Sequence, residues 1–370
     1  MINSLYVSRL ADLLVNYSLS LGKGKEVVYR STYEALPLAV EVVRAVVESG
    51  SYPIVMMGDE VLSEVFYRYA SEEVLKYVPK VDKFIMENVD ALISVVSSTH
   101  TKHLASIDPT KIKIASAARK ELTEVFMKRS AEGSLKWVVT AYPTKALAQD
   151  AGMSFGDYAN FVFKALKVDR ENPVEEWKKQ AEFQEKVAEF LKKVSELRFV
   201  GPEMDITFRV EGRNWVNDDG EHNMPGGEVF TAPIEDSAEG YIEFTYPAVW
   251  RGKEVEGVRL RFEKGVVVEA SAKRGEDFLK KMLKTDEGAS RVGELAFGLN
   301  YDVKRFTKSI LFDEKIGGTI HIALGAAYPE CGGKNVSAIH WDMVRDMKDS
   351  KVYADGDLVY ENGKFIEEVL

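Results

Sequence analysis

The sequence of 370 residues is poor in cysteine and in long apolar segments. Cys331 is its single cysteine, so no disulfide can form within the chain, which is typical of a reducing compartment. No window approaches the roughly 18 uninterrupted apolar residues that a membrane-spanning helix needs. The N-terminal segment also lacks the continuous apolar core of a signal peptide. We therefore predict a cytoplasmic protein that does not engage a membrane.

Basic charge is also in deficit, because the formal net charge is -10. An acidic surface repels the phosphate backbone, so we predict that nucleic acid is not a partner. The sequence has no G-x-G-x-x-G or G-x-x-x-x-G-K-[ST] phosphate loop. A nucleotide-binding role for the first 200 residues is weakened by these absences but stays open.

The first half of the chain alternates short β-rich apolar runs with helical patterns. The apolar runs are 27–29, 52–57, 91–96 and 137–142, and the helical patterns are 34–49, 60–77, 109–130 and 173–197. Such alternation predicts βαβ units with a largely parallel sheet covered by helices. Pro173 suits the first position of the last helix, because its fixed φ is helical and its missing N–H is not needed there.

Strand patterns and turn signals dominate after Pro202. Residues 208–211, 242–244 and 258–262 alternate apolar and polar side chains, as half-buried antiparallel strands do. Asp355 and Gly356 form a preferred hairpin turn within 351–360. The fold class predicted is therefore α/β followed by α+β: an N-terminal α/β domain over 1–200 and a strand-rich mixed domain over 201–370.

Four segments of the second half place acids or histidines where a strand-rich core should be apolar. These residues are Glu228, Glu294, His321, His340 and Asp342. Side chains of an extended segment alternate between faces, so His340 and Asp342 point the same way while Trp341 packs on the other side. An imidazole and a carboxylate presented together from one strand can chelate a cation.

A metal ion is the simplest partner for these groups. An unpaired buried carboxylate is costly, and the four segments hold no excess of Arg or Lys. Two divalent cations would balance three carboxylates and one hydroxide, and five ligands exceed the need of one catalytic zinc. Spacing alone also allows structural roles without a metal. Each histidine could be a hydrogen-bonded core residue, and each glutamate a turn or cap residue. His100 and His103 form a further pair without an evident third ligand.

The same segments resemble the family of aminopeptidase T and aminopeptidase S, which are thermostable metallo-aminopeptidases. The matching segments are 223–233, 293–298, 321–329 and 337–343, with a looser match at 141–154. Pro-Gly-Gly-Glu-Val in the first and Ile-His-Trp-Asp-Met in the last are specific, because neither string is a generic fold signature. One departure is the short segment between Tyr328 and His340, which looks like a trimmed loop.

The resemblance implies a ligand set, an activity and an assembly. It makes Glu228, Glu294, His321, His340 and Asp342 the metal ligands and puts Tyr328 at the metals with a part in catalysis. It implies a catalytic C-terminal domain that removes the N-terminal residue of peptides, two divalent ions per chain, and a homodimer. The mixed nitrogen and oxygen ligands suit zinc, cobalt or manganese.

A hydroxide bridging two metals would then attack the first peptide carbonyl. Glu294 either bridges the metals or acts as the general base, and Tyr328 donates a hydrogen bond to the oxyanion. Two alternatives remain open from the residues: another two-metal hydrolase, such as an amidase or phosphoesterase, and a metal-stabilised binding protein without catalysis. The preferred N-terminal side chain is not predicted.

Overall fold

The computed structural model describes residues 2–250 and 252–370 of the chain. The chain forms two compact units, of which the first extends to Glu176 and includes Gly220–Pro225. The second comprises Trp177–Asp219 and Gly226–Leu370. The domain boundary near residue 200 stays a prediction, and the segment from 177 to 200 clusters with the second unit. The reason is that Val187 and Leu191 of its helix are buried in the core of that unit.

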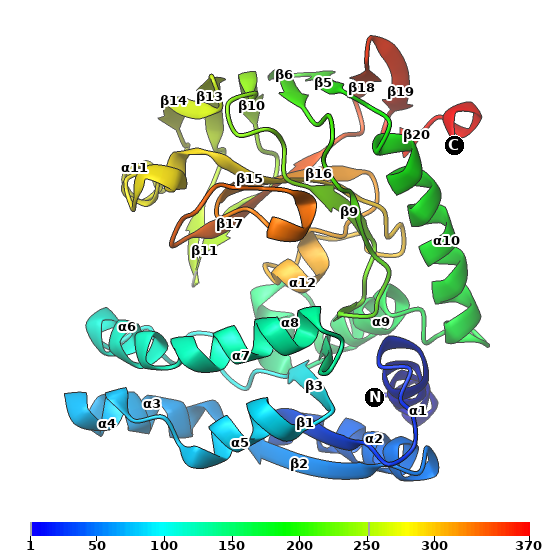
Figure 1. The fold of residues 1–370 in the computed structure, drawn as a ribbon, viewed down its shortest axis with the longest axis vertical. Helices are drawn as coiled ribbons and strands as arrows, with labels where there is room; N and C mark the ends of the chain where they lie inside the picture. The colour runs from blue at the N-terminus through cyan, green and yellow to red at the C-terminus, as the bar shows by residue number, and fades with distance from the viewer. Residues whose placement is uncertain (1, 251) are drawn as a thin grey trace. The chain divides into compact units, whose positions relative to one another are not determined.

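The first unit is built on a parallel sheet, as predicted (Figure 1). Its strands, in spatial order, are β2 (Tyr52–Gly58), β1 (Glu26–Thr32), β3 (Ala91–Val96), β4 (Lys136–Ala141) and β8 (Asn223–Met224). Its helices are α1 (Ser4–Leu13), α2 (Leu36–Glu48), α3 (Glu60–Tyr69), α4 (Glu72–Lys76), α5 (Lys80–Asn88), α6 (Pro109–Ala118), α7 (Lys120–Ala131), α8 (Lys145–Asp150) and α9 (Phe155–Ala165). All of the predicted apolar runs form strands, so the α/β class is confirmed for this part.

The helical patterns are shorter in the structure than predicted. The pattern over 60–77 is divided at Ser71, whose side chain caps α4 by accepting from the Val74 N–H. The helix that begins at Pro173, α10, ends at Leu191 rather than at residue 197. Residues from Glu196 onward form β5 (Glu196–Gly201) instead, because they alternate between exposed and buried positions, which suits a strand.

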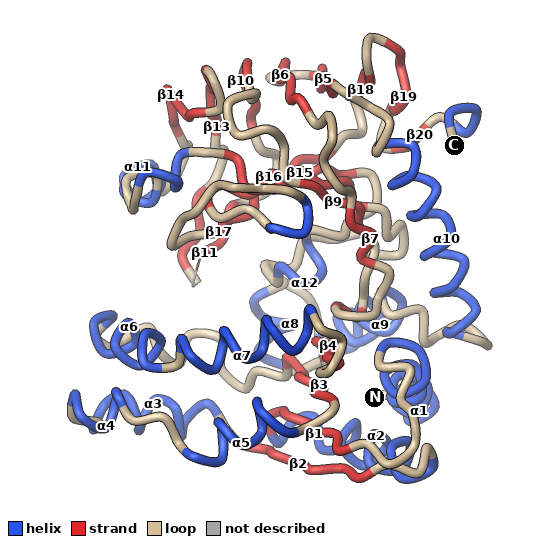
Figure 2. Tube along the Cα trace, in the orientation of Figure 1, coloured by secondary structure: helices blue, strands red, loops and turns tan. Residues whose placement is uncertain are grey.

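The described part of the second unit is rich in strands (Figure 2) and contains three antiparallel sheets, of eight, five and two strands. The largest sheet has eight strands, in the order β14 (Val266–Ser271), β13 (Arg259–Glu263), β10 (Glu239–Glu243), β6 (Met204–Arg209), β5, β18 (Lys351–Ala354), β19 (Asp357–Glu361) and β20 (Lys364–Phe365). The next sheet has five strands, in the order β17 (His340–Asp346), β16 (Thr319–Gly325), β15 (Val292–Gly298), β9 (Glu228–Thr231) and β7 (Val216–Asp218). We call it the small sheet. The two-stranded sheet pairs β11 (Ala248–Trp250) with β12 (Lys253–Val255), and the helices of this unit after α10 are α11 (Glu276–Met282) and α12 (Ile310–Asp313).

The main core of the second unit lies between the eight-stranded sheet and the small sheet. Phe199 of β5 and Phe297 of β15 meet there with ring centroids 5.8 Å apart. Trp341 and Met343 of β17 are buried in the same core, on the face predicted for them. The predicted hairpin near the C-terminus forms as β18 and β19 with its turn at Asp355 and Gly356. Within the described residues, no helix is both long enough and apolar enough to cross a membrane.

Candidate metal centre

The face of the small sheet that is turned away from the core carries all five predicted ligands. Strand register puts Glu294, Ala323 and Asp342 in one row and Ala296, His321 and Val344 in the next. Glu228 lies opposite Gly298 on β15. Rows on one face alternate with rows on the other, so these residues share a face opposite the core residues. We call it the polar face, and its alanine and glycine neighbours leave room beside the polar side chains.

An irregularity in β15 brings Glu294 onto this face. Val292 pairs with Leu324 and Glu294 pairs with Ala323, so one extra residue, Gly293, is inserted between them. A Cβ atom on Gly293 would lie 2.3 Å from the Ala326 carbonyl oxygen, which only glycine avoids. The bulge therefore needs glycine, and it turns Glu294 toward the polar face while Val292 stays on the core side.

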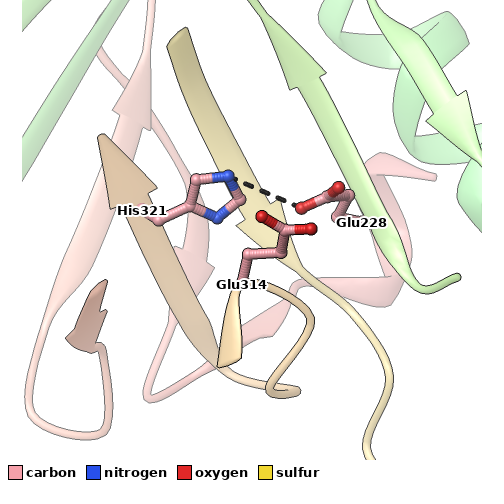
Figure 3. Close-up of side chains that lie close together, drawn as sticks. All are labelled: Glu228, Glu314 and His321. Carbon is pink, nitrogen blue, oxygen red and sulfur yellow. Dashed lines mark ion pairs between the residues drawn. The ribbon is translucent and has the colours of Figure 1, made fainter. Parts of the chain in front are cut away.

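Glu228, Glu314 and His321 form one cluster of possible metal donors, which we call the Glu228 group (Figure 3). One donor atom from each lies within 4.8 Å of the others. The His321 Nε2 atom is 3.5 Å from Glu228 Oε2. Glu228 and His321 are buried, while Glu314, directly after α12, is partly exposed. Two carboxylates and an imidazole converging at this spacing are suited to one divalent cation.

Glu294, His340 and Asp342 form a second cluster, the Glu294 group, with the same 4.8 Å limit between donor atoms. His340 Nε2 lies 2.9 Å from Glu294 Oε2 and 3.4 Å from Asp342 Oδ1. The other ring nitrogen of His340 is 2.8 Å from the Ala326 carbonyl oxygen, which fixes the ring. Glu294 Oε1 is also 3.7 Å from His321 Nε2, so Glu294 lies between the two groups.

Sequence reasoning missed two residues of this region, Glu314 and Lys315. The Lys315 ammonium group is fully buried, 3.1 Å from Glu228 Oε1 and 3.2 Å from Asp218 Oδ2, and it also pairs with Glu314. Lys315 lies outside the four segments that supply the predicted ligands, so the lack of basic residues in those segments did not reveal this partner of Glu228. A charged Asp-Glu-Lys run shortly before two glycines is typical of a solvated turn, so nothing in the sequence distinguished it.

The buried acids strongly perturb the titration of the histidines. Burial alone would lower the pKa of His321, but Glu294 and Glu228 outweigh it and raise that pKa to about 9. Burial likewise opposes the charge on His340, yet Asp342 and Glu294 raise its pKa to about 12. Burial alone would raise the pKa of Glu294, but the imidazoles of His321 and His340 outweigh it and lower that pKa to about 2. Burial raises the pKa of Glu228 well above its usual range, against the pull of Lys315.

Several buried donor atoms of the polar face have no hydrogen-bond partner among the described residues. These are Glu228 Oε2, both ring nitrogens of His321, and Asp342 Oδ1. Buried polar atoms are almost always satisfied in native proteins, so this concentration needs an explanation. Divalent cations supply it, because the same residues make up the two donor groups. The residues present therefore fit a metal centre.

Tyr328 lies beside the Glu294 group. Its ring contacts the His340 imidazole edge to face, with centroids 4.9 Å apart, and also contacts Phe230 at 5.4 Å. Burial, with the charge of Glu294 adding to it, raises the pKa of its hydroxyl, so the group stays protonated and able to donate. Burial also raises the pKa of the nearby Cys331 thiol to about 12, which keeps it protonated.

The remaining histidines stand apart from this centre. His103 Nδ1 lies 2.9 Å from the carbonyl oxygen of His100, and both side chains belong to an exposed turn after β3. Neither belongs to a group of three possible donors among the described residues. His222 stacks on Trp137 with ring centroids 4.5 Å apart.

Imidazoles and carboxylates grouped on one face of a packed sheet are the donor set of a metal-dependent protein. Residues 4–365 match the model of a family described as thermophilic metalloprotease (M29). The chain belongs to this family. Aminopeptidase T of Thermus thermophilus is 29% identical over 394 residues, covering 96% of this chain and 95% of that protein. Aminopeptidase AmpS of Bacillus subtilis is 27% identical, covering 96% of this chain and 97% of that protein.

Solved structures agree with the family assignment. Wild-type AmpT from Thermus thermophilus superposes with a TM-score of 0.85 at 26% identity, covering 98% of this chain and 99% of that one. A 2,5-dihydroxypyridine dioxygenase from Pseudomonas putida reaches a TM-score of 0.63 at 13% identity, which shows a likeness of fold alone. The predicted resemblance and the predicted enzyme class, a metallo-aminopeptidase, are confirmed.

Proposed function

We propose that this chain removes the N-terminal residue from peptides with a free amine, using two divalent ions held on the polar face. The Glu228 group would hold one ion and the Glu294 group the other, with Glu294 placed to bridge them. The observation that carries the proposal is the pair of adjacent donor groups, joined by the 3.7 Å approach of Glu294 to His321. Zinc, cobalt and manganese all suit these donors.

The residues of the chain have distinct parts in the proposed reaction. Bound divalent ions supply an activated water and polarise the scissile carbonyl. A Glu294 oxygen accepts the proton released as that water attacks, and the protonated Tyr328 hydroxyl donates a hydrogen bond to the developing oxyanion.

Lys315 helps to separate this proposal from a phosphoesterase. Phosphate substrates usually recruit a basic side chain that is free to contact them beside the metals. Lys315 is fully buried and already paired with Glu228, Asp218 and Glu314, so its charge is committed within the protein. Peptides therefore suit the site better than phosphate esters.

Hydrolysis of aminoacyl amides and their N-acetylated counterparts tests the function. We expect cleavage of the free-amine substrates only, with loss of activity on chelation, recovery on addition of a divalent metal, and an intact fold throughout. If chelation unfolds the protein and no added metal gives activity, the alternative of a metal-stabilised binding protein without catalysis is favoured instead. Cleavage of both substrate series would indicate a general amidase.

We further propose that the chain acts as a cytoplasmic homodimer. Apolar side chains are exposed along β2 and α3 of the first unit, among them Tyr52 at 63% and Leu62 at 60%. Exposed apolar surface of this kind marks protein–protein contact sites. A monomeric mass in sedimentation equilibrium contradicts this part of the proposal.

A further inference from the structure

A cavity of about 260 Å³ lies in the second unit beside the candidate metal centre. Asp342 and Val344 of β17 line it. Both belong to the polar face, because Asp342 pairs with Ala323 and Val344 pairs with His321. The cavity therefore shares one carboxylate, that of Asp342, with the Glu294 group.

The apolar walls of this cavity are held in place by contacts outside it. Val249 of β11 lines one side, and its carbonyl oxygen accepts a hydrogen bond from Trp341 Nε1 at 3.1 Å. Phe306 lines another side and stacks on Tyr246 with ring centroids 5.1 Å apart. Ile310, which is 48% exposed, lines it as well. The cavity is thus formed before any ligand arrives.

Two polar side chains of the lining besides Asp342 already have partners. Lys308 Nζ lies 2.9 Å from Glu254 Oε1, so its charge is neutralised locally. Asp313 Oδ1 accepts hydrogen bonds from the N–H of Thr307 at 2.6 Å and from its hydroxyl at 2.9 Å. A ligand therefore gains mainly from the apolar walls, through removal of its own apolar surface from water.

We propose that this cavity receives the side chain of the substrate's N-terminal residue and favours large apolar side chains, such as those of leucine and phenylalanine. The inference rests on the proposed function, which puts the amine and first carbonyl of the peptide at the adjacent metal centre. A cavity of about 150 Å³ accommodates benzene, so this larger one has room for a phenyl ring. Acidic side chains are disfavoured, because a carboxylate buried against the apolar walls loses its hydration without gaining a free basic partner.

Cleavage of L-leucine, L-phenylalanine, L-alanine and L-glutamate amides by the metal-loaded protein tests this inference. We expect kcat/KM for leucine and phenylalanine to exceed that for alanine by about tenfold or more, since each buried methylene contributes to discrimination. Glutamate amide should be the poorest substrate. A preference for alanine or for glutamate would overturn the inference while leaving the aminopeptidase activity established.

Val249→Phe tests whether this particular cavity is responsible. The added ring fills the cavity, so the ratio of kcat/KM for leucine to that for alanine should fall by about tenfold. Val268→Phe is the matched control, because Val268 is a 44% exposed residue of β14 outside the cavity and should leave the ratio unchanged. Equal ratios in the wild type and in a folded Val249→Phe protein overturn the inference.

A second variant and a binding measurement cover the case in which Val249→Phe does not fold. Ile310→Ala trims an exposed wall residue, so the fold should survive while the leucine-to-alanine ratio falls severalfold. Calorimetry should show that the wild type binds free L-leucine more tightly than free L-alanine. Ile310→Ala should bind L-leucine more weakly than the wild type does. An unchanged ratio in Ile310→Ala overturns the cavity assignment. Absence of cleavage in every protein, with metal bound, overturns the proposed function and this inference together.

Discussion

Lys315 is the residue whose role is least visible in the sequence and most constrained in the structure. Its ammonium group is fully buried among Glu228, Asp218 and Glu314. A buried ion pair adds little net stability when it is complete, but removing one partner leaves an uncompensated charge. Lys315 also binds Glu228 Oε1 and leaves Oε2 directed toward His321. It therefore orients a proposed ligand.

Lys315→Met tests this positioning role. The free energy of unfolding of the metal-free protein should fall by about 3–5 kcal/mol, because buried carboxylates lose their counter-charge. The loss should be smaller with saturating metal, which supplies positive charge to the Glu228 group. Denaturation in urea, with and without metal, measures both.

Lys351→Met provides the matched control for that experiment. Lys351 pairs with Glu361 at 3.0 Å, but its side chain is 47% exposed. Removing an exposed pair should change the unfolding free energy by at most about 1 kcal/mol, with or without metal. Equal losses in the two variants would show that Lys315 has no special role.

Tyr328→Phe separates catalysis from metal binding. Loss of the hydroxyl removes the proposed oxyanion donor, so kcat should fall by about 100-fold or more. Metal content, measured on the purified protein, should stay unchanged, because the Tyr328 hydroxyl stays protonated and its ring packs against His340. A parallel loss of metal would make Tyr328 a ligand instead.

At the scale of elements, strand β15 decides the geometry of the centre. Its bulge at Gly293 is the reason that Val292 faces the core while Glu294 reaches both imidazoles. A regular strand would put these two residues on one face, because side chains alternate strictly. The glycine, rather than the glutamate alone, therefore determines where the carboxylate lies.

Gly293→Ala should disturb the proposed bridging ligand. The new methyl group meets the Ala326 carbonyl oxygen, so the unfolding free energy should fall by about 1–3 kcal/mol and metal binding should weaken. Gly156→Ala is the control, since a Cβ atom added at this position in α9 would point into open space. It should be neutral or stabilising by up to about 1 kcal/mol. Unchanged stability and metal affinity in Gly293→Ala would argue against a required glycine.

At the scale of the whole molecule, acidic residues outnumber basic ones, and carboxylates are also the most numerous donors at the site. The formal charge is -10, and each donor group contains two carboxylates. In the metal-free protein His321 and His340 hold protons at neutral pH, because their pKa values are raised to about 9 and 12. Protons and metal ions therefore compete for the same nitrogens.

Metal binding should release protons, and metal affinity should rise as the pH increases toward the pKa of His321, about 9. The sign follows because a raised pKa keeps the imidazole charged, and a metal binds only its neutral form. Calorimetry in buffers of different ionisation enthalpy counts the protons. His340→Gln should lower that count, whereas His222→Gln, on the stacked His222 outside both groups, should not. Proton uptake on metal binding would contradict this account.

The amino-acid sequence by itself determined the local order of this protein. Short apolar runs were enough to locate β1 to β4 of the first unit, and apolar alternation was enough to locate β10 and β13 of the second. Period-two geometry was enough to put His340 and Asp342 on one side of their strand. These features depend on neighbours in the chain, so they can be recognised without knowing what packs where.

Only the tertiary structure decided which distant groups meet. Glu314 joins Glu228 and His321, Lys315 joins the same acids, and Glu294 lies between both histidines. Strand order, strand register and the bulge at Gly293 bring these residues into contact. All three features depend on packing across the whole sheet rather than on local spacing. For the same reason the cavity beside Asp342, built from β11, β17 and the region around α12, has no signature in any single segment.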